Sequence, residues 1–594
     1  MTQALDRETT HLVDSVSTDR LMEDTREIAR WVRLSGSPEE RRAFAYIERR
    51  LREAGLRTQL LEHDALISLP QSAALRLSDP DPEEIPCITH SFAVSTPRDG
   101  IAAEAVAVRE GPPAGTLSGR VAIVDGLATP DDVAKLQSDG AVGVIFLNRD
   151  PLVHEMIVST IWGSPTLSQL GRLPSIPVVS AAGDGAVRVR ARAAGGRRVR
   201  VRLTTAVQTG WRRLPLLVAE ADGTGDDTFV LLARHVDSWH YGAMDNGGAN
   251  AVMMEVGRLL ARTRLYRGLR LTFWSGHSHG RYAGSTWYVD SHWDELNARC
   301  AAHLNVDSVG GRGATKLDAG YCMPETREVG VRVVGALAGQ QYRGTRVGRS
   351  GDQSFLGIGV PSLFMSLSEH PADGPEASRD FSSTGIAAGG GLGWWWHTPE
   401  DTVDKLDPAA LTRDARIYAA SAHILCASPV LPLDYAATAA EIVTSLRALE
   451  KRLGDRFDIS ACVAEAEHLR DAAAQVTQAA RSAAGNAKDA PAMNRTLMQL
   501  GRTLIPVLYT RAGRFDHDPA TQIPELPPLL EASRLAEVDP DSDEAKALRV
   551  AAVRGRNRLV QALREARQLI ETGARERGNP HAHSAGSGRS AGRR

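Results

Sequence analysis

Residues 229–248 read FVLLARHVDSWHYGAMDNGG, an apolar run that passes directly into a segment rich in histidine, aspartate and glycine. The apolar residues at 229–233 predict a buried strand. In extended backbone, residues i and i+2 point the same way, so Asp237 is expected to lie behind His235 and accept its second ring N–H. Asp245, in a glycine-flanked turn, supplies a carboxylate that can reach the same place and bridge two ions. Together these residues predict a metal site, although His235 and Asp237 taken alone also fit a buried structural pair.

Strands and helices alternate around this stretch, between about 206 and 430. The apolar runs 269–273 and 302–306 predict further strands, and 249–263 predicts a helix. Such alternation predicts an α/β fold with a mainly parallel sheet flanked by helices, whose ligands bind at the carboxyl ends of the strands.

Two further candidate ligands follow later strands. Asp307 lies in LNVDSVG and His397 lies in WWWHTPEDT. With His235 and Asp245, they offer the nitrogen and oxygen atoms that zinc prefers. We therefore expect Zn²⁺ as cofactor, as one or two ions.

The chain of 594 residues is too long for one hydrophobic core and is expected to fold as several domains. The segment SPEE, Ser37 to Glu40, predicts a helix start. By composition we divide the chain into N-terminal helices and a strand of the catalytic domain (1–85), a β-rich module (86–205), the α/β catalytic domain (206–430), long helices (431–575) and a disordered tail (576–594).

Charge and cysteine content exclude some classes of protein. The formal net charge of -2 gives no field that would attract nucleic acid or an anionic membrane. The 5 cysteines are widely spaced, which argues against a disulfide framework. The polar N-terminus and the lack of a long apolar run predict a cytoplasmic protein with no membrane contact.

Here the sequence resembles the zinc-dependent peptidases that include bacterial aminopeptidases, glutamate carboxypeptidase II and the transferrin receptor. The family signature of His-x-Asp-Ser, Gly-Ala-x-Asp-Asn, Asn-x-Asp-x-x-Gly and His-Thr-x-x-Asp-Thr is met by the stretches quoted above. The resemblance implies that His235 and Asp307 hold one zinc, that His397 helps to hold the second, and that Asp245 bridges them.

Other segments resemble the larger family members. The loop GDQSF, with Asp352, looks like the family's loop carrying an acid and a phenylalanine. Residues 117–125 are similar to a protease-associated domain, and 493–500 and 515–519 look like a helical dimerisation domain. The resemblance implies a homodimer formed through 431–575, whose helices carry apolar stripes.

The family's Glu-Glu pair, whose first member is the general base, is absent. This chain reads WSGHSHGRYAGS at 274–285, without a carboxylate. His277 or His279 can replace the missing zinc ligand, and we expect His277 to do so. The missing base can be replaced by the other histidine or by Glu369.

Trp396 stands where many members have a tyrosine that stabilises the tetrahedral intermediate. Arg343, Arg346 and Arg349 precede the loop of Asp352 and are candidates to clamp a substrate carboxylate, although arginines in such a stretch also fit a solvated surface. The favoured reading is a zinc-dependent exopeptidase acting on a peptide or small amide. The alternatives are an inactive homologue that acts as a dimeric binding or scaffold protein, and acyl transfer or cyclisation.

Overall fold

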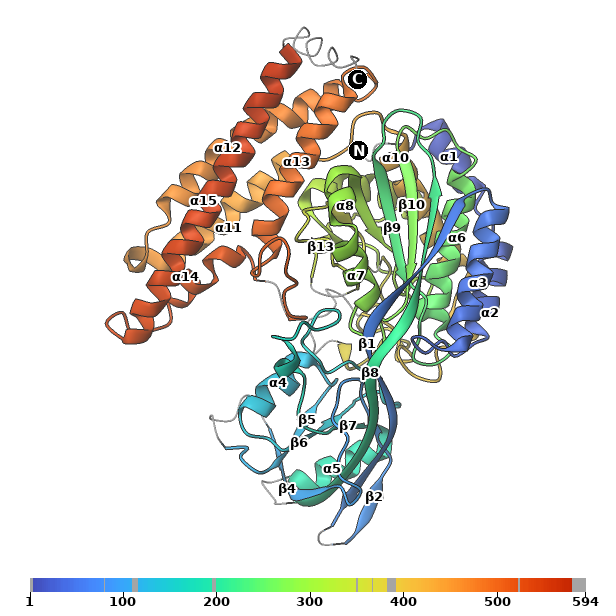
Figure 1. Cartoon of the computed structure of the whole chain (residues 1–594), viewed down its shortest axis with the longest axis vertical. Helices are drawn as coiled ribbons and strands as arrows, with labels where there is room; N and C mark the ends of the chain where they lie inside the picture. The colour runs from blue at the N-terminus through green and yellow to red at the C-terminus, as the bar shows by residue number, and fades with distance from the viewer. Residues whose placement is uncertain are drawn as a thin grey trace, which may run out of the picture.

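The computed structural model describes residues 4–78, 81–108, 116–194, 199–348, 351–365, 367–381, 391–521 and 524–578. Figure 1 shows an α/β body, a smaller lobe below it, and a layer of long helices at its side. The α/β fold expected from the alternation of strands and helices is confirmed.

The body is built around a buried sheet. Its strands are β9 (Phe229–His235), β10 (Gly268–Trp274), β11 (Cys300–Asn305), β12 (Tyr321–Cys322), β13 (Thr345–Arg346), β14 (Ser362–Leu363) and the upper part of β8 (Val199–Ala221). Its helices are α1 (Arg7–Asp14), α2 (Thr18–Ala29), α3 (Pro38–Glu53), α6 (Ala249–Leu260), α7 (Ala283–Ser291), α8 (Trp293–Arg299), α9 (Arg327–Ala338) and α10 (Pro408–Ala427).

Strand β9 lies between β10 and β11 and runs parallel to both. Every residue of β9 is buried. Leu231 and Ala233 face α7 and α8, whereas Val230 and Leu232 face α6 and α10. His235 is paired with Trp274 of β10, so these strands end together and the loops that follow them meet at one edge.

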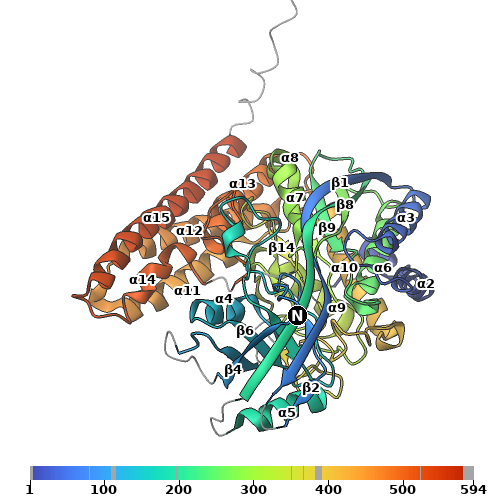
Figure 2. The ribbon, with the colours of Figure 1, turned by 60° about the horizontal axis from the view of Figure 1, so that its bottom comes forward.

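The strands β1 (Arg57–Leu77) and β8 connect the body to the lobe as one long antiparallel pair (Figures 1 and 2). The register shifts between Pro70 and Ser72. Above this bulge Ile67 packs in the core of the body, and below it Leu75 packs in the core of the lobe. The change of core therefore falls inside β1 and β8. The predicted boundary at 205/206 lies in β8 opposite the bulge, whereas the predicted boundary at 85/86 lies beyond the end of β1.

The lobe contains β2 (Glu83–Ile85), β3 (Ile88–Thr89), β4 (Ile101–Ala107), β5 (Val121–Asp125), β6 (Gly143–Leu147), β7 (Val178–Ala181), α4 (Pro130–Ser138) and α5 (Gly183–Ala193). Strands β4 to β7 are parallel neighbours, and β4 joins the sheet of the body through β8. That this lobe is a protease-associated domain stays a prediction.

The side layer consists of α11 (Tyr435–Leu453), α12 (Ser460–Ser482), α13 (Ala490–Tyr509), α14 (Leu530–Arg534) and α15 (Asp543–Gly578). Their apolar faces form one core with residues of the body, among them Tyr321, Met323 and Leu356. The apolar stripes that led us to expect a partner subunit are thus covered largely within the chain. The homodimer stays a prediction.

Some expectations concern the chain as a whole. Within the described ranges, no helix is long and apolar enough to cross a membrane. All cysteines are free thiols. Helix α15 continues to Gly578, three residues into the predicted tail, and the rest of that tail lies outside the described residues.

Candidate metal centre

Three segments of the chain meet at the carboxyl edge of β9, β10 and β11. His235 ends β9, Asp245 lies in the connection from β9 to α6, Asp307 follows β11, and His397 precedes α10. His235 is fully buried, and Asp307 is partly exposed. The parallel strands thus bring together residues that lie far apart in the sequence.

His235, Asp245 and Asp307 each offer a ligand atom within 4.8 Å of the others. His235 Nε2 lies 3.3 Å from Asp245 Oδ1. Two ligands of a tetrahedral zinc ion, each about 2.0–2.2 Å from it, are separated by roughly this distance. Asp245 Oδ1 is buried without a hydrogen-bond partner, as expected of an atom that binds a cation. This donor set fits one divalent ion.

The other oxygen of Asp245 faces the fourth candidate. Asp245 Oδ2 lies 3.0 Å from His397 Nε2, while His397 Nδ1 contacts the carbonyl of Glu155 at 2.6 Å. One carboxylate thus faces two imidazoles, as the bridging role requires. Among the described residues, His397 does not belong to any group of three or more potential ligands. A second ion beside His397 would therefore have only two side-chain ligands from the described chain, His397 and Asp245.

Asp237 supports His235 mainly through its backbone. The carbonyl of Asp237 lies 2.8 Å from His235 Nδ1, and its carboxylate Oδ1 lies 3.4 Å away. That carboxylate accepts hydrogen bonds from Ser35 Oγ at 2.6 Å and from the backbone N–H of Ser278 at 2.8 Å. Either contact of Asp237 with Nδ1 fixes the Nδ1–H tautomer of His235, so that the lone pair of Nε2, which faces the Asn246 amide, is the one a cation could use.

Asp245 is held by a second carboxylate. Asp401 accepts the backbone N–H of Met244 at 2.8 Å and that of Asp245 at 3.0 Å. Burial raises the pKa of Asp401 to about 7, although these hydrogen bonds oppose the shift. The motif residue Asp401 therefore orients the turn that carries the proposed bridging carboxylate.

His277 points toward Asp352. Its Nδ1 lies 2.7 Å from Asp352 Oδ2, and its ring stacks on His235 with centroids 3.7 Å apart. Burial lowers the pKa of His277, but the charge of Asp352 outweighs it, and the net shift is upward. Within the described parts of the chain, Nε2 has no hydrogen-bond partner. That His277 is a zinc ligand stays a prediction.

His279 has a different environment. Its Nδ1 lies 2.9 Å from Ser35 Oγ, and its ring packs on Trp239 at 4.5 Å. Burial lowers its pKa to about 4, so the ring is neutral near pH 7. His279 is thus a neutral side chain packed between Ser35 and Trp239.

The remaining candidates lie at or beyond the edge of this group. Trp396 stacks on His397 with centroids 3.3 Å apart. Glu369 is buried and pairs through its backbone with Lys316. Arg346 bonds the carbonyl of Leu508 and lies over the ring of Tyr509 in α13.

The arginine clamp thus rests on sequence alone. Arg343 is exposed, and its backbone N–H bonds Asp318. Arg349 lies outside the described residues. The guanidinium of Arg346 is engaged with the helical layer.

Two residues of the site were missed by the sequence reasoning. Arg234 is fully buried, with Nη1 2.7 Å from Asp307 Oδ2. Asn246 Nδ2 lies 2.7 Å from His235 Nε2 and donates to Asp307 Oδ1 at 3.2 Å, while its Oδ1 accepts the N–H of Ser308. An ion at this position would displace the Asn246 amide from Nε2. The signal for Arg234 was a charge at the end of an apolar strand.

A second buried cluster lies beside His397. His154 Nε2 lies 2.9 Å from Asp150 Oδ2, and His154 Nδ1 contacts the carbonyl of Trp396 at 2.5 Å. Asp380 accepts the backbone N–H groups of Arg149 and Asp150. These groups already have protein partners, so the cluster ties the lobe to the loop that carries His397.

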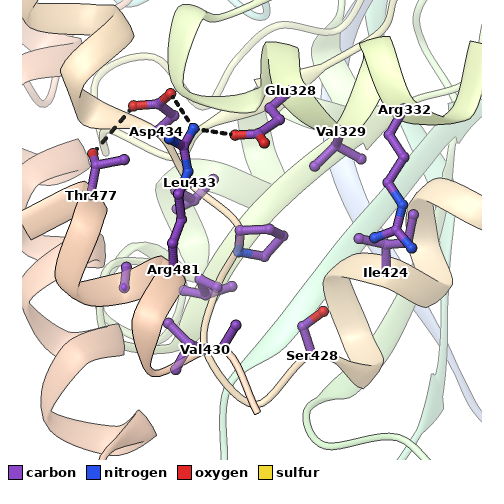
Figure 3. Close-up of a pocket in the computed structure, with 14 residues that line it drawn as sticks. Glu328, Val329, Arg332, Ile424, Ser428, Val430, Leu433, Asp434, Thr477 and Arg481 are labelled. Atoms are coloured by element: carbon purple, nitrogen blue, oxygen red, sulfur yellow. Dashed lines mark hydrogen bonds and ion pairs between the residues drawn. The ribbon is translucent and has the colours of Figure 1, made fainter. Parts of the chain in front are cut away.

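A cavity of about 360 Å³ lies elsewhere, where α9 and α10 meet α12 (Figure 3). Arg481 reaches Glu328 at 2.7 Å and Asp434 at 3.1 Å across it. None of the residues of the candidate metal centre lines this cavity. It belongs to the junction with the helical layer.

Comparison with known proteins agrees with the geometry. Residues 217–422 match the model of peptidase family M28. A probable glutamate carboxypeptidase, VP8 of Zea mays, is 24% identical over 72% of this chain and 69% of its own length. The probable glutamate carboxypeptidase LAMP1 of Arabidopsis thaliana is 25% identical over 47% of this chain and 41% of its own length.

Two solved structures share the fold. A peptidase M28 precursor from Shewanella amazonensis superposes with a TM-score of 0.57 and 19% identity, covering 72% of this chain and 97% of its own. BSAP, a zinc aminopeptidase from Bacillus subtilis, superposes with a TM-score of 0.52 and 18% identity, covering 69% of this chain and 96% of its own. These two likenesses show the fold of the α/β body.

Proposed function

We propose that this chain is a zinc-dependent hydrolase of peptide or small amide bonds, acting as an exopeptidase. The observation that supports it most is the convergence of His235, Asp245 and Asp307, with Asp245 Oδ1 buried and unpaired. A divalent ion held by these residues would supply Lewis-acid chemistry at the scissile carbonyl.

We assign the role of general base to His277. Asp352 accepts Nδ1–H at 2.7 Å, which orients the ring and leaves Nε2 to take a proton from the attacking water. Such a contact would orient a zinc ligand equally well. The base role is preferred because His277 is not among the groups of three or more potential ligands in the described chain. Trp396 stacks on His397 and so lies beside the proposed metal centre.

A binding protein without turnover is the second candidate function. The loop at 274–285 favours it, because this loop contains two histidines and no carboxylate that could act as the general base. The small number of ligands for a second ion, only two side chains, favours it as well. Acyl transfer or cyclisation would use the same ligands and base, with an amine in place of water as nucleophile.

The experiment combines metal analysis with turnover by the full chain. We expect bound zinc and hydrolysis of amino-acid amides or acylated amino acids. His277→Gln should lower kcat about 10²- to 10⁴-fold and leave the zinc content unchanged, as expected for loss of a general base. The matched control His279→Gln should retain kcat within tenfold. Bound zinc without turnover of any such substrate would favour the binding protein, and a chain without zinc would contradict the proposal.

A further inference from the structure

Arg234 places a permanent positive charge inside the candidate metal centre. Its side chain is 0% exposed, with Nη1 2.7 Å from Asp307 Oδ2 and Nη2 4.0 Å from Asp352 Oδ2. All three of its side-chain nitrogens are buried without a directed hydrogen bond among the described residues. A guanidinium in this position is retained only if nearby carboxylates compensate its charge.

The position of Arg234 follows from the strand. Successive side chains of β9 alternate, so Arg234 leaves on the face of Val230 and Leu232, opposite to His235. Arg234 and His235 are nevertheless linked through Asp307. Its Oδ2 pairs with Arg234, and its Oδ1 accepts from Asn246, which in turn contacts His235. Asp307 Oδ1, which also accepts from Ser308 Oγ at 2.9 Å, is therefore the oxygen that would bind an ion once the Asn246 amide is displaced.

We propose that Arg234 is a built-in cation that neutralises Asp307 Oδ2 and Asp352, so that the centre takes one divalent ion per chain instead of two. This inference rests on the proposed function. The fixed charge of Arg234 repels further cations, and the place beside His397 has too few ligands to offset that repulsion. Arg234 is a positioning residue, because it acts through Asp307 and Asp352.

Removal of the guanidinium would leave two carboxylates without the cation that neutralises them. Asp307 and Asp352 would lose the cation between them, and His277 already contacts Asp352 at 2.7 Å. The ligand atoms of Asp307, Asp352 and His277 do not all lie within 4.8 Å of one another in the structure, so the uncompensated side chains would have to move toward a second ion to form a donor set that zinc accepts. We therefore expect Arg234→Met to bind a second zinc ion.

The experiment measures zinc per chain by native mass spectrometry and by elemental analysis after equilibration at fixed free zinc. The full-length wild type should hold one ion. Arg234→Met should hold two, and Arg234→Lys, which keeps the charge, should return the count to one. Arg267→Met is the matched control, because Arg267 is equally buried but bonds the carbonyls of Leu425, Ser428 and Pro429 away from the centre.

Each outcome decides a different claim. Two ions on the wild type, or one ion on a folded Arg234→Met, contradict the role of Arg234 and leave the proposed hydrolase standing. If Arg234→Met does not fold, the counts for the wild type and Arg234→Lys still test the proposal, since either holding two ions overturns it. No zinc on the wild type contradicts the proposed function and this inference together.

Discussion

Asp237 shows how one side chain links several parts of the candidate centre. Its carboxylate accepts from Ser35 and Ser278, and its backbone carbonyl faces His235 Nδ1 at 2.8 Å. The side chain therefore fixes the loop at 274–285 against the strand end. The orientation of His235 depends more on the backbone of this residue than on its carboxylate.

Asp237→Asn is expected to weaken zinc binding about tenfold. Partners that orient a ligand typically contribute 10- to 100-fold to affinity, and the low end applies because the backbone carbonyl is retained. Competition with a chromophoric chelator measures the change. Asp404→Asn, at an exposed position, is the control and should leave affinity unchanged. A loss above 100-fold would show that the carboxylate itself orients the imidazole.

The turn η4 (Pro324–Thr326) joins the body to α11 through one buried carboxyl group. Glu325 Oε2 accepts from Thr438 of α11 at 2.8 Å, and its backbone carbonyl accepts the N–H of Asp434. Glu325 Oε1 is buried without a partner in the described chain. Burial raises the pKa of Glu325 to about 7. The junction is thus most stable when this carboxyl group is protonated.

Stability should therefore fall as the pH rises. The folded pKa of about 7 lies above that of the unfolded chain, about 4.3, so the stabilisation is complete below pH 4.3 and lost as the pH passes 7. The shift corresponds to about 4 kcal/mol at most. Glu325→Gln should make the melting temperature less sensitive between pH 5 and 8. Glu328→Gln, on an exposed ion pair, should behave as the wild type. Parallel curves for wild type and Glu325→Gln would contradict this account.

The helical layer and the body form a continuous structure through Arg502 of α13. Arg502 is 8% exposed, and its guanidinium donates to the carbonyls of Leu296, Asn297, Cys300 and Gly359. The surrounding core contains apolar residues of both parts. The helices are therefore part of the same folded unit, even though they carry none of the candidate ligands.

Arg502→Ala is expected to destabilise the full chain by about 3 kcal/mol, because several buried carbonyls lose a charged donor at once. Chemical unfolding followed by circular dichroism gives the change, and limited proteolysis between α10 and α11 should become faster. The exposed Arg470→Ala is the control and should change stability by less than about 0.5 kcal/mol. Equal stability of wild type and Arg502→Ala would mean that the layer is held by its apolar core alone.

The sequence by itself determined the elements and the edge at which the ligand candidates meet. The apolar run before His235 predicted β9, and Ser37 caps α3, which begins at Pro38 as expected. Alternating strands and helices predicted that Asp245, Asp307 and His397 lie near His235. These features follow from periodicity, capping and the rule that parallel strands end together, which are all readable along one chain.

Only the tertiary structure decided the partners of the charged side chains and the limits of the domains. His277 pairs with Asp352, 75 positions away, and Arg234 with Asp307, because separate loops pack into one buried space. Along β1 and β8 the buried side chains pass from the core of the body to the core of the lobe. The apolar stripes of the C-terminal helices pack against one another and against the body of the same chain. Periodicity shows which face of a segment is apolar, but the desolvation of each charge selects its partner in three dimensions.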